Sequence, residues 1–169
     1  MTLADALLPE FDHEMATTRR LLERVPEHRF DWQPHEKSMT LGRLASHLSE
    51  IPDWGFEACT GDEIDVAPEG KERPKPHVHE SRSDLLNAFD ANVAKARDAI
   101  ARTDDATMMR DWSLKGGGQT YFTLPKIAVI RAWVMNHNVH HRGQLSVYLR
   151  LLDVPVPSIY GPSADERGG

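Results

Sequence analysis

The chain has 169 residues and a formal net charge of −6, with 27% charged and 40% hydrophobic residues. This length is sufficient for a single domain, residues 1–169, and the interspersed charges argue against nucleic acid or an anionic membrane as a partner. The lone Cys59 excludes an intramolecular disulfide, and the N-terminus lacks a long apolar stretch, so we expect a cytoplasmic protein.

Two helices are predicted in the first third of the chain, where apolar residues recur at three- and four-residue steps. The first covers Thr2 to Val25 and ends at Pro26. The second is capped by the hydroxyl of Thr40 and ends near Thr60.

Two further helices are predicted in the remainder. One runs from about Ser83 to Arg102, and the other, the longest, runs to about Leu152. We expect Thr123 to cap this last helix and Pro125 to lie in its first turn.

The three connections between these helices, Pro26–Met39, Gly61–Arg82 and Thr103–Phe122, are longer than the 2–8 residues usual in helix bundles. Each is long enough to cross a bundle from end to end, and the third can form a small hairpin around Gly116–Gly118. The fold class is therefore all-α, a four-helix bundle with long crossover connections.

The stretch "NHNVHHRGQLSVYLR" of the fourth helix places His137 and His141 four residues apart, within about 40° around the axis. They point to the apolar side of the helix, and this spacing can hold one metal ion. A lone buried histidine is usually a core residue. Two buried imidazoles, however, each need a polar partner, and one metal ion would serve both. From this pair alone, metal binding and core packing both remain open.

The neighbouring residues limit the interpretation. His140 projects to the other side, which favours a surface or supporting role. A zinc protease would need glutamate after the first histidine, where this chain has Asn138.

Among the other histidines, His47 alone shares a helical face with core residues, so it can complete a three-nitrogen site with an open position. His13 falls outside the apolar face of its helix, and His28 and His35 are expected in an exposed connection. His77 and His79 form an alternating pair that could bind a metal in an extended segment, but we expect them to be exposed loop residues.

The stretches "MTLGRLASHLSE" and "NHNVHHRGQLSVYLRLLDVPVPSIYGPSADE" resemble the DinB/YfiT-like family of metalloenzymes, whose members are four-helix bundles and commonly homodimers. The resemblance places the metal ligands at His47, His137 and His141. It implies a DinB-like domain over the whole chain and a divalent ion, without distinguishing Zn, Ni, Fe or Mn.

The resemblance also implies thiol-dependent S-transferase chemistry on a small-molecule substrate, with a low-molecular-weight thiol as partner. The alternatives are a metal-hydroxide hydrolase and a non-catalytic metal-binding stress-response protein. No catalytic residue is assigned.

Three residues are candidates for a supporting or pocket role. Glu50, one turn after His47, can accept the second N–H of a ligand imidazole or be solvated. Gln144 and Tyr148 share the histidine face, although core packing explains Tyr148 equally well.

Three further side chains are given structural roles. We expect Cys59 to be a buried, inert thiol and Arg142 to be structural or interfacial. Tyr160 is expected to anchor the chain as it returns across the bundle.

Overall fold

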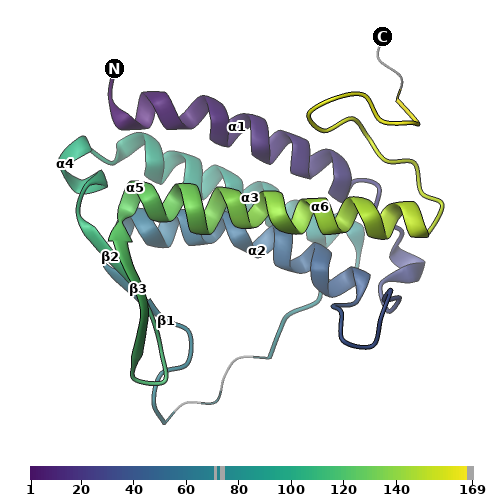
Figure 1. Ribbon diagram of the computed structural model, residues 1–169, viewed down its shortest axis with the longest axis horizontal. Helices are drawn as coiled ribbons and strands as arrows, with labels where there is room; N and C mark the ends of the chain where they lie inside the picture. Colours follow the sequence, from purple (N-terminus) through teal and green to yellow (C-terminus); the bar gives the residue numbers. More distant parts are fainter. Residues whose placement is uncertain (71, 73–74, 167–169) are drawn as a thin grey trace.

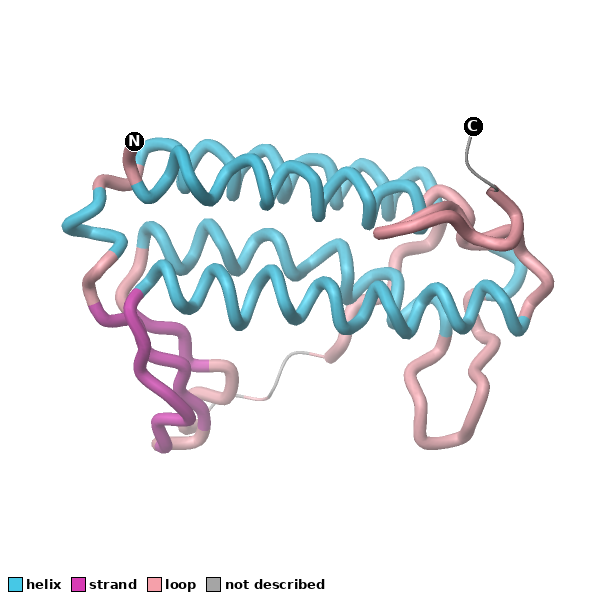
Figure 2. Tube along the Cα trace, turned by 45° about the horizontal axis from the view of Figure 1, so that its top comes forward, coloured by secondary structure: helices cyan, strands magenta, loops and turns pink. Residues whose placement is uncertain are grey.

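The computed structural model describes residues 1–70, 72 and 75–166. Long helices run side by side along the molecule, and a small sheet projects from one end of them (Figures 1 and 2). The elements in chain order are α1 (Leu3–Leu22), η1 (Glu27–Arg29), α2 (Leu41–Thr60), β1 (Glu63–Asp65), α3 (Arg82–Arg102), α4 (Asp105–Met108), β2 (Asp111–Gly116), β3 (Gln119–Pro125), α5 (Lys126–Val129), the π-helix η2 (Ile130–Met135) and α6 (Asn136–Leu151).

The helices begin where side chains satisfy the free backbone N–H groups. Thr2 and Asp5 form a reciprocal capping box on α1, with hydrogen bonds of 3.1 and 2.8 Å. The Thr40 hydroxyl accepts from Arg43 N at 3.2 Å, which confirms the predicted cap of α2. Ser81 caps α3 through Asp84 N at 3.0 Å, so this helix begins one residue before the predicted start.

Helix α2 lies at the centre of the packing. Twelve of its 20 residues are buried, including Leu44, Leu48 and Ile51, which are at most 1% exposed. Phe11 from α1, Phe89 from α3 and Leu145 from α6 belong to the same apolar core. This packing fixes the position of the α2 face that carries His47.

The prediction of an all-α chain is incomplete. The helix-rich part is confirmed, but residues from the second and third connections and from the predicted start of the fourth helix form a three-stranded sheet of order β1-β2-β3. Strand β2 pairs antiparallel with β3 and parallel with β1. The predicted hairpin is confirmed, since Gly117 and Gly118 turn the chain with φ of 58° and 76°, angles that favour glycine.

The prediction for the start of the fourth helix was wrong. Thr123 and Pro125 lie in β3, where Thr123 pairs with Ser113 and Pro125 with Asp111. The helix begins at Lys126 and has no side-chain cap. Thr123 was misassigned because a Thr–Leu–Pro sequence also fits the last residues of a strand.

The fourth helical stretch is also not a single α-helix. Residues Ile130–Met135 form a π-helix between α5 and α6, so the 100° per residue assumed for a continuous α-helix does not hold before Asn136. None of the helices within the described residues combines the length and the apolar character needed to cross a bilayer.

Candidate metal centre

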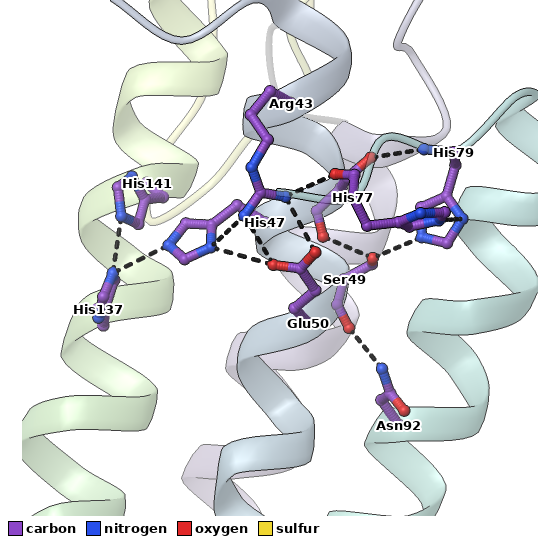
Figure 3. A network of polar contacts seen from close by, with 10 residues as sticks. Arg43, His47, Ser49, Glu50, His77, His79, Asn92, His137 and His141 are labelled. Atoms are coloured by element: carbon purple, nitrogen blue, oxygen red, sulfur yellow. Dashed lines mark hydrogen bonds and ion pairs between the residues drawn. The ribbon is translucent and has the colours of Figure 1, made fainter. Parts of the chain in front are cut away.

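Three histidine side chains from two helices converge between α2 and α6 (Figure 3). His137 Nε2 lies 3.2 Å from His47 Nε2 and 2.7 Å from His141 Nε2. One ring nitrogen of each residue lies within 4.8 Å of the other two. His141 is buried and the other two are half-buried, so the cluster is shielded but not sealed.

In His47 and His141, the second ring nitrogen lies next to a hydrogen-bond acceptor. Gln144 Oε1 accepts from His141 Nδ1 at 2.7 Å. Glu50 Oε2 lies 3.4 Å from His47 Nδ1 and can accept its proton. With these protons on Nδ1, the Nε2 lone pairs of both rings face His137.

The surroundings of His137 and His141 favour the neutral form of both imidazoles. Burial, followed by the proximity of His141, His47 and His140, lowers the pKa of His137 to about 4. Burial also lowers the pKa of His141, although the hydrogen bond to Gln144 opposes this shift. These two imidazoles are therefore uncharged at neutral pH, which is the form that binds metals.

This donor set fits a divalent cation. Lone pairs that face each other at 2.7–3.2 Å repel unless a proton or a cation lies between them. Two nitrogens that bind one tetrahedral ion at about 2.0–2.1 Å are about 3.3 Å apart. The 3.2 Å between His47 and His137 is close to this value, whereas the 2.7 Å between His137 and His141 is shorter. Three nitrogens leave a fourth position open.

Arg43 lies against the outer side of His47. Its Nη1 and Nη2 donate to Glu50 Oε1 and Oε2 at 3.0 and 2.8 Å, and Nη2 lies 3.3 Å from His47 Nδ1. Burial alone would raise the pKa of Glu50, but the hydrogen bonds from His47 and Arg43 hold this pKa below its usual range. Glu50 is therefore a carboxylate that can orient the imidazole.

A group of aromatic rings connects the histidines to the sheet. The Trp54 ring packs edge-on against His47 and His137, with centroids 5.5 and 5.3 Å away. The Trp54 ring also stacks on Trp133 of the π-helix, with ring centroids 4.5 Å apart. Trp133 lies 5.3 Å from the fully buried Trp112 of β2. The sheet therefore supports the apolar wall of the cluster.

A pocket of about 650 Å³ lies beside the cluster. It is lined by Arg43, Glu50, Trp54, Val66, Lys75, Pro76 and His77. Arg43, Glu50 and Trp54 all contact His47 as well. The pocket thus offers a small molecule an aromatic face, the Arg43–Glu50 ion pair and the Lys75 ammonium group next to the histidines.

The remaining predicted residues are distributed as follows. Gln144 contacts His141, whereas Tyr148 donates its hydroxyl proton to Met39 O at 3.2 Å and so attaches the connection between α1 and α2 to α6.

His140 and His13 are exposed, as predicted. His28 and His35 are exposed in the first connection and His77 in the second, but His79 is half-buried against α2, contrary to expectation.

The structural roles predicted for three other side chains are confirmed. Burial raises the pKa of the Cys59 thiol, which is 7% exposed. Arg142, 1% exposed, forms an ion pair with Glu14 at 2.6 Å. The Tyr160 hydroxyl donates to Glu14 at 2.9 Å and accepts from Arg142 at 2.6 Å, so it anchors the returning chain to α1 and α6.

Arg43 and Trp54 are the site residues that sequence reasoning did not assign. Arg43 lies four residues before His47 and Glu50 three residues after it, so all three share one helical face. This spacing was a usable signal for Arg43. The stack of Trp54 on Trp133 had no such signal, because it depends on the π-helix.

Comparisons with known proteins agree with this architecture. The model of the DinB family matches residues 1–167. YrdA, an uncharacterized protein of Bacillus subtilis strain 168, is 25% identical over 162 residues, which cover 96% of this chain and 90% of YrdA.

Solved structures with a similar fold include two DinB-like proteins. One, from Bacillus cereus ATCC 10987, superposes with a TM-score of 0.69 and 20% identity over 94% of this chain and 98% of its own. The other, YjoA from Bacillus subtilis, gives a TM-score of 0.66 and 16% identity over 96% and 99%.

Proposed function

The chain belongs to the DinB family, and from this premise we propose that it is a divalent-metal-dependent enzyme, specifically a thiol-dependent S-transferase. The observation that carries the proposal is the convergence of His47, His137 and His141 on one point between α2 and α6. A divalent ion bound there would act as a Lewis acid that lowers the pKa of a thiol or water molecule entering its open position.

The residues of the chain have separate tasks in this proposal. The three imidazoles would hold the ion and, as uncharged ligands, would leave its positive charge undiminished. Glu50 and Gln144 can accept the second N–H of His47 and His141, which would keep both Nε2 atoms directed at the point where the ion would bind. Trp54 shields one side of the cluster from water.

The contacts of Glu50 favour a thiol over water as the activated group. Both oxygens of Glu50 accept hydrogen bonds from Arg43, so this carboxylate is a poor general base. A free thiol has a pKa of about 8.5 and bulk water about 15.7. A thiol therefore needs much less assistance to ionise at neutral pH.

The thiol is expected to come from a substrate. Cys59 is buried, and its raised pKa keeps it protonated, so it is unsuitable as a nucleophile. The pocket beside the histidines has room for a small molecule, and its Lys75 side chain suits a thiol that carries a negatively charged group.

The proposal is tested with cobalt-substituted protein and a set of small thiols. We expect a productive thiol to give a sulfur-to-cobalt charge-transfer band and to attack a model electrophile faster when the metal is present. His140→Ala, which changes an exposed histidine, should keep both signals, and His137→Ala should lose both.

Two outcomes would replace the proposal. If azide perturbed the cobalt spectrum and no thiol did, a hydrolase that activates water would be the better interpretation. If neither ligand changed the spectrum of a fully loaded protein, the site would be non-catalytic.

A further inference from the structure

A second pair of histidines lies in the segment between the sheet and α3. His77 Nε2 and His79 Nδ1 are 3.4 Å apart. The segment is fastened to α2 at three points: Arg43 Nη1 donates to His77 O at 2.9 Å, His79 N donates to Ser46 Oγ at 3.0 Å, and His79 Nε2 contacts Ser49 Oγ at 3.0 Å (Figure 3). The pair is therefore held in place from α2.

The contact with Ser49 fixes the protonation of His79. The single hydroxyl proton of Ser49 is donated to Ser46 O at 2.7 Å, so its oxygen must accept from His79 Nε2–H. A neutral His79 then has a lone pair on Nδ1, the nitrogen that faces His77. The buried serine thus prepares His79 as a ligand in the way that Gln144 prepares His141.

The geometry of the pair resembles that of the cluster between α2 and α6. The separation of 3.4 Å is close to the value of about 3.3 Å for two nitrogens on one tetrahedral ion. It is long for an N–H···N hydrogen bond. The ring centroids are 4.6 Å apart, the same distance as between His137 and His141.

We propose that His77 and His79 form a second binding site for a divalent transition-metal ion, at the rim of the pocket beside the three-histidine cluster. Two ligands leave its other positions to water or to an anionic group, so this site binds more weakly than the cluster. His77 is exposed and lines the pocket, so an ion held there faces the space where a small molecule would bind. The inference does not depend on the proposed thiol chemistry.

The experiment is a titration of metal-free, full-length protein with Zn²⁺ alone, followed by calorimetry. The wild type should show two classes of site. His77→Ala should weaken the second class by at least about tenfold and leave the first unchanged. The His137→Ala, His141→Ala double variant should weaken the first class and leave the second unchanged. His35→Ala, which changes an exposed histidine in another connection, should change neither class.

A second variant and a spectroscopic measurement separate ligation from loss of structure. Ser49→Ala should weaken the second class while far-UV circular dichroism stays unchanged. In the metal-free wild type, the imidazole ¹⁵N shifts of His79 should show that the proton is on Nε2. In Ser49→Ala the shifts should show a mixture of the two tautomers. A wild type with only one class of site, or a second class that persists in His77→Ala, would overturn the inference.

Discussion

Arg43 binds both carboxylate oxygens of Glu50, and the same guanidinium lies 3.3 Å from His47 Nδ1. The position of one metal-binding candidate is therefore set by an ion pair on its own helix. The guanidinium also holds His77 O, so it connects the cluster to the wall of the neighbouring pocket.

Loss of any one of the three clustered histidines should remove the tightly bound metal. We expect His47→Ala, His137→Ala and His141→Ala each to lower the affinity by more than about a hundredfold, because a direct ligand contributes more than a supporting residue. Elemental analysis after gel filtration measures this. His140→Ala and His13→Ala change exposed histidines and should retain the metal. A full equivalent in the His137→Ala, His141→Ala variant would rule out the site.

Glu50→Gln should weaken metal binding by about tenfold to a hundredfold, because an amide holds the Nδ1 proton of His47 less strongly than a carboxylate. Competition with a chromophoric chelator measures the affinity. Asp53→Asn is the matched control, since Asp53 lies on the same helix and pairs with Lys95 at 2.7 Å, away from the cluster. Equal affinities for the Glu50 and Asp53 variants would show that Glu50 has no role in binding.

The metal-free protein should lose stability as the pH falls from 6.5 towards 4. His137 has an ordinary pKa of 6.5 when unfolded and about 4 when folded, so protons in this range bind preferentially to the unfolded chain. The stabilising contribution of the neutral ring is complete above pH 6.5 and is lost progressively as the pH falls to about 4. Since the ring is half-buried, solvent screening reduces the effect to about 1 kcal/mol.

This pH effect is measured by thermal unfolding in the presence of a chelator. His137→Gln lacks the titrating group and should show a shallower decline between pH 6.5 and 4. Parallel curves for the variant and the wild type would contradict the assignment to His137.

Cys59 should react slowly with thiol reagents in the folded protein. It is 7% exposed, and burial raises its pKa, so both access and thiolate content are low. We expect a rate at least about tenfold below that of the unfolded chain at pH 8. Thiol transfer by Cys59→Ala should equal that of the wild type. A large loss of transfer in a folded Cys59→Ala protein would implicate this cysteine in the reaction.

Replacing Arg142 by methionine should destabilise the fold by about 3–5 kcal/mol, because it leaves the carboxylate of Glu14 buried without its partner. Urea unfolding measures the loss. Removal of both partners in Glu14→Leu, Arg142→Leu should recover much of it. Arg97→Ala breaks an exposed pair with Asp12 and should cost less than about 1 kcal/mol.

The helical periodicity of the apolar residues predicted the long helices and the faces on which they pack. The face of α2 that carries His47 was identified correctly, because its apolar neighbours repeat at helical steps and Thr40 caps the helix. Strand β1 was missed, since three residues are too few to show an alternating pattern and its pairing depends on β2, far along the chain.

For the candidate metal centre, the three clustered histidines were predictable from the sequence, but not all of their surroundings were. The separation of His137 and His141 and the inward face of His47 were enough to predict that the three meet. The half-buried position of His79 was not predictable, because it follows from hydrogen bonds to Ser46 and Ser49 on another element. The homodimer inferred from the resemblance stays a prediction.

The π-helix at Ile130–Met135 has a consequence for comparing relatives of this chain. A π turn corresponds to an α turn with one inserted residue, so it marks where a helix can change length without moving either end. A relative with an uninterrupted α-helix here is expected to be one residue shorter between Lys126 and His137. Alignment gaps in this region belong inside the π turn, where they leave the three histidines in register.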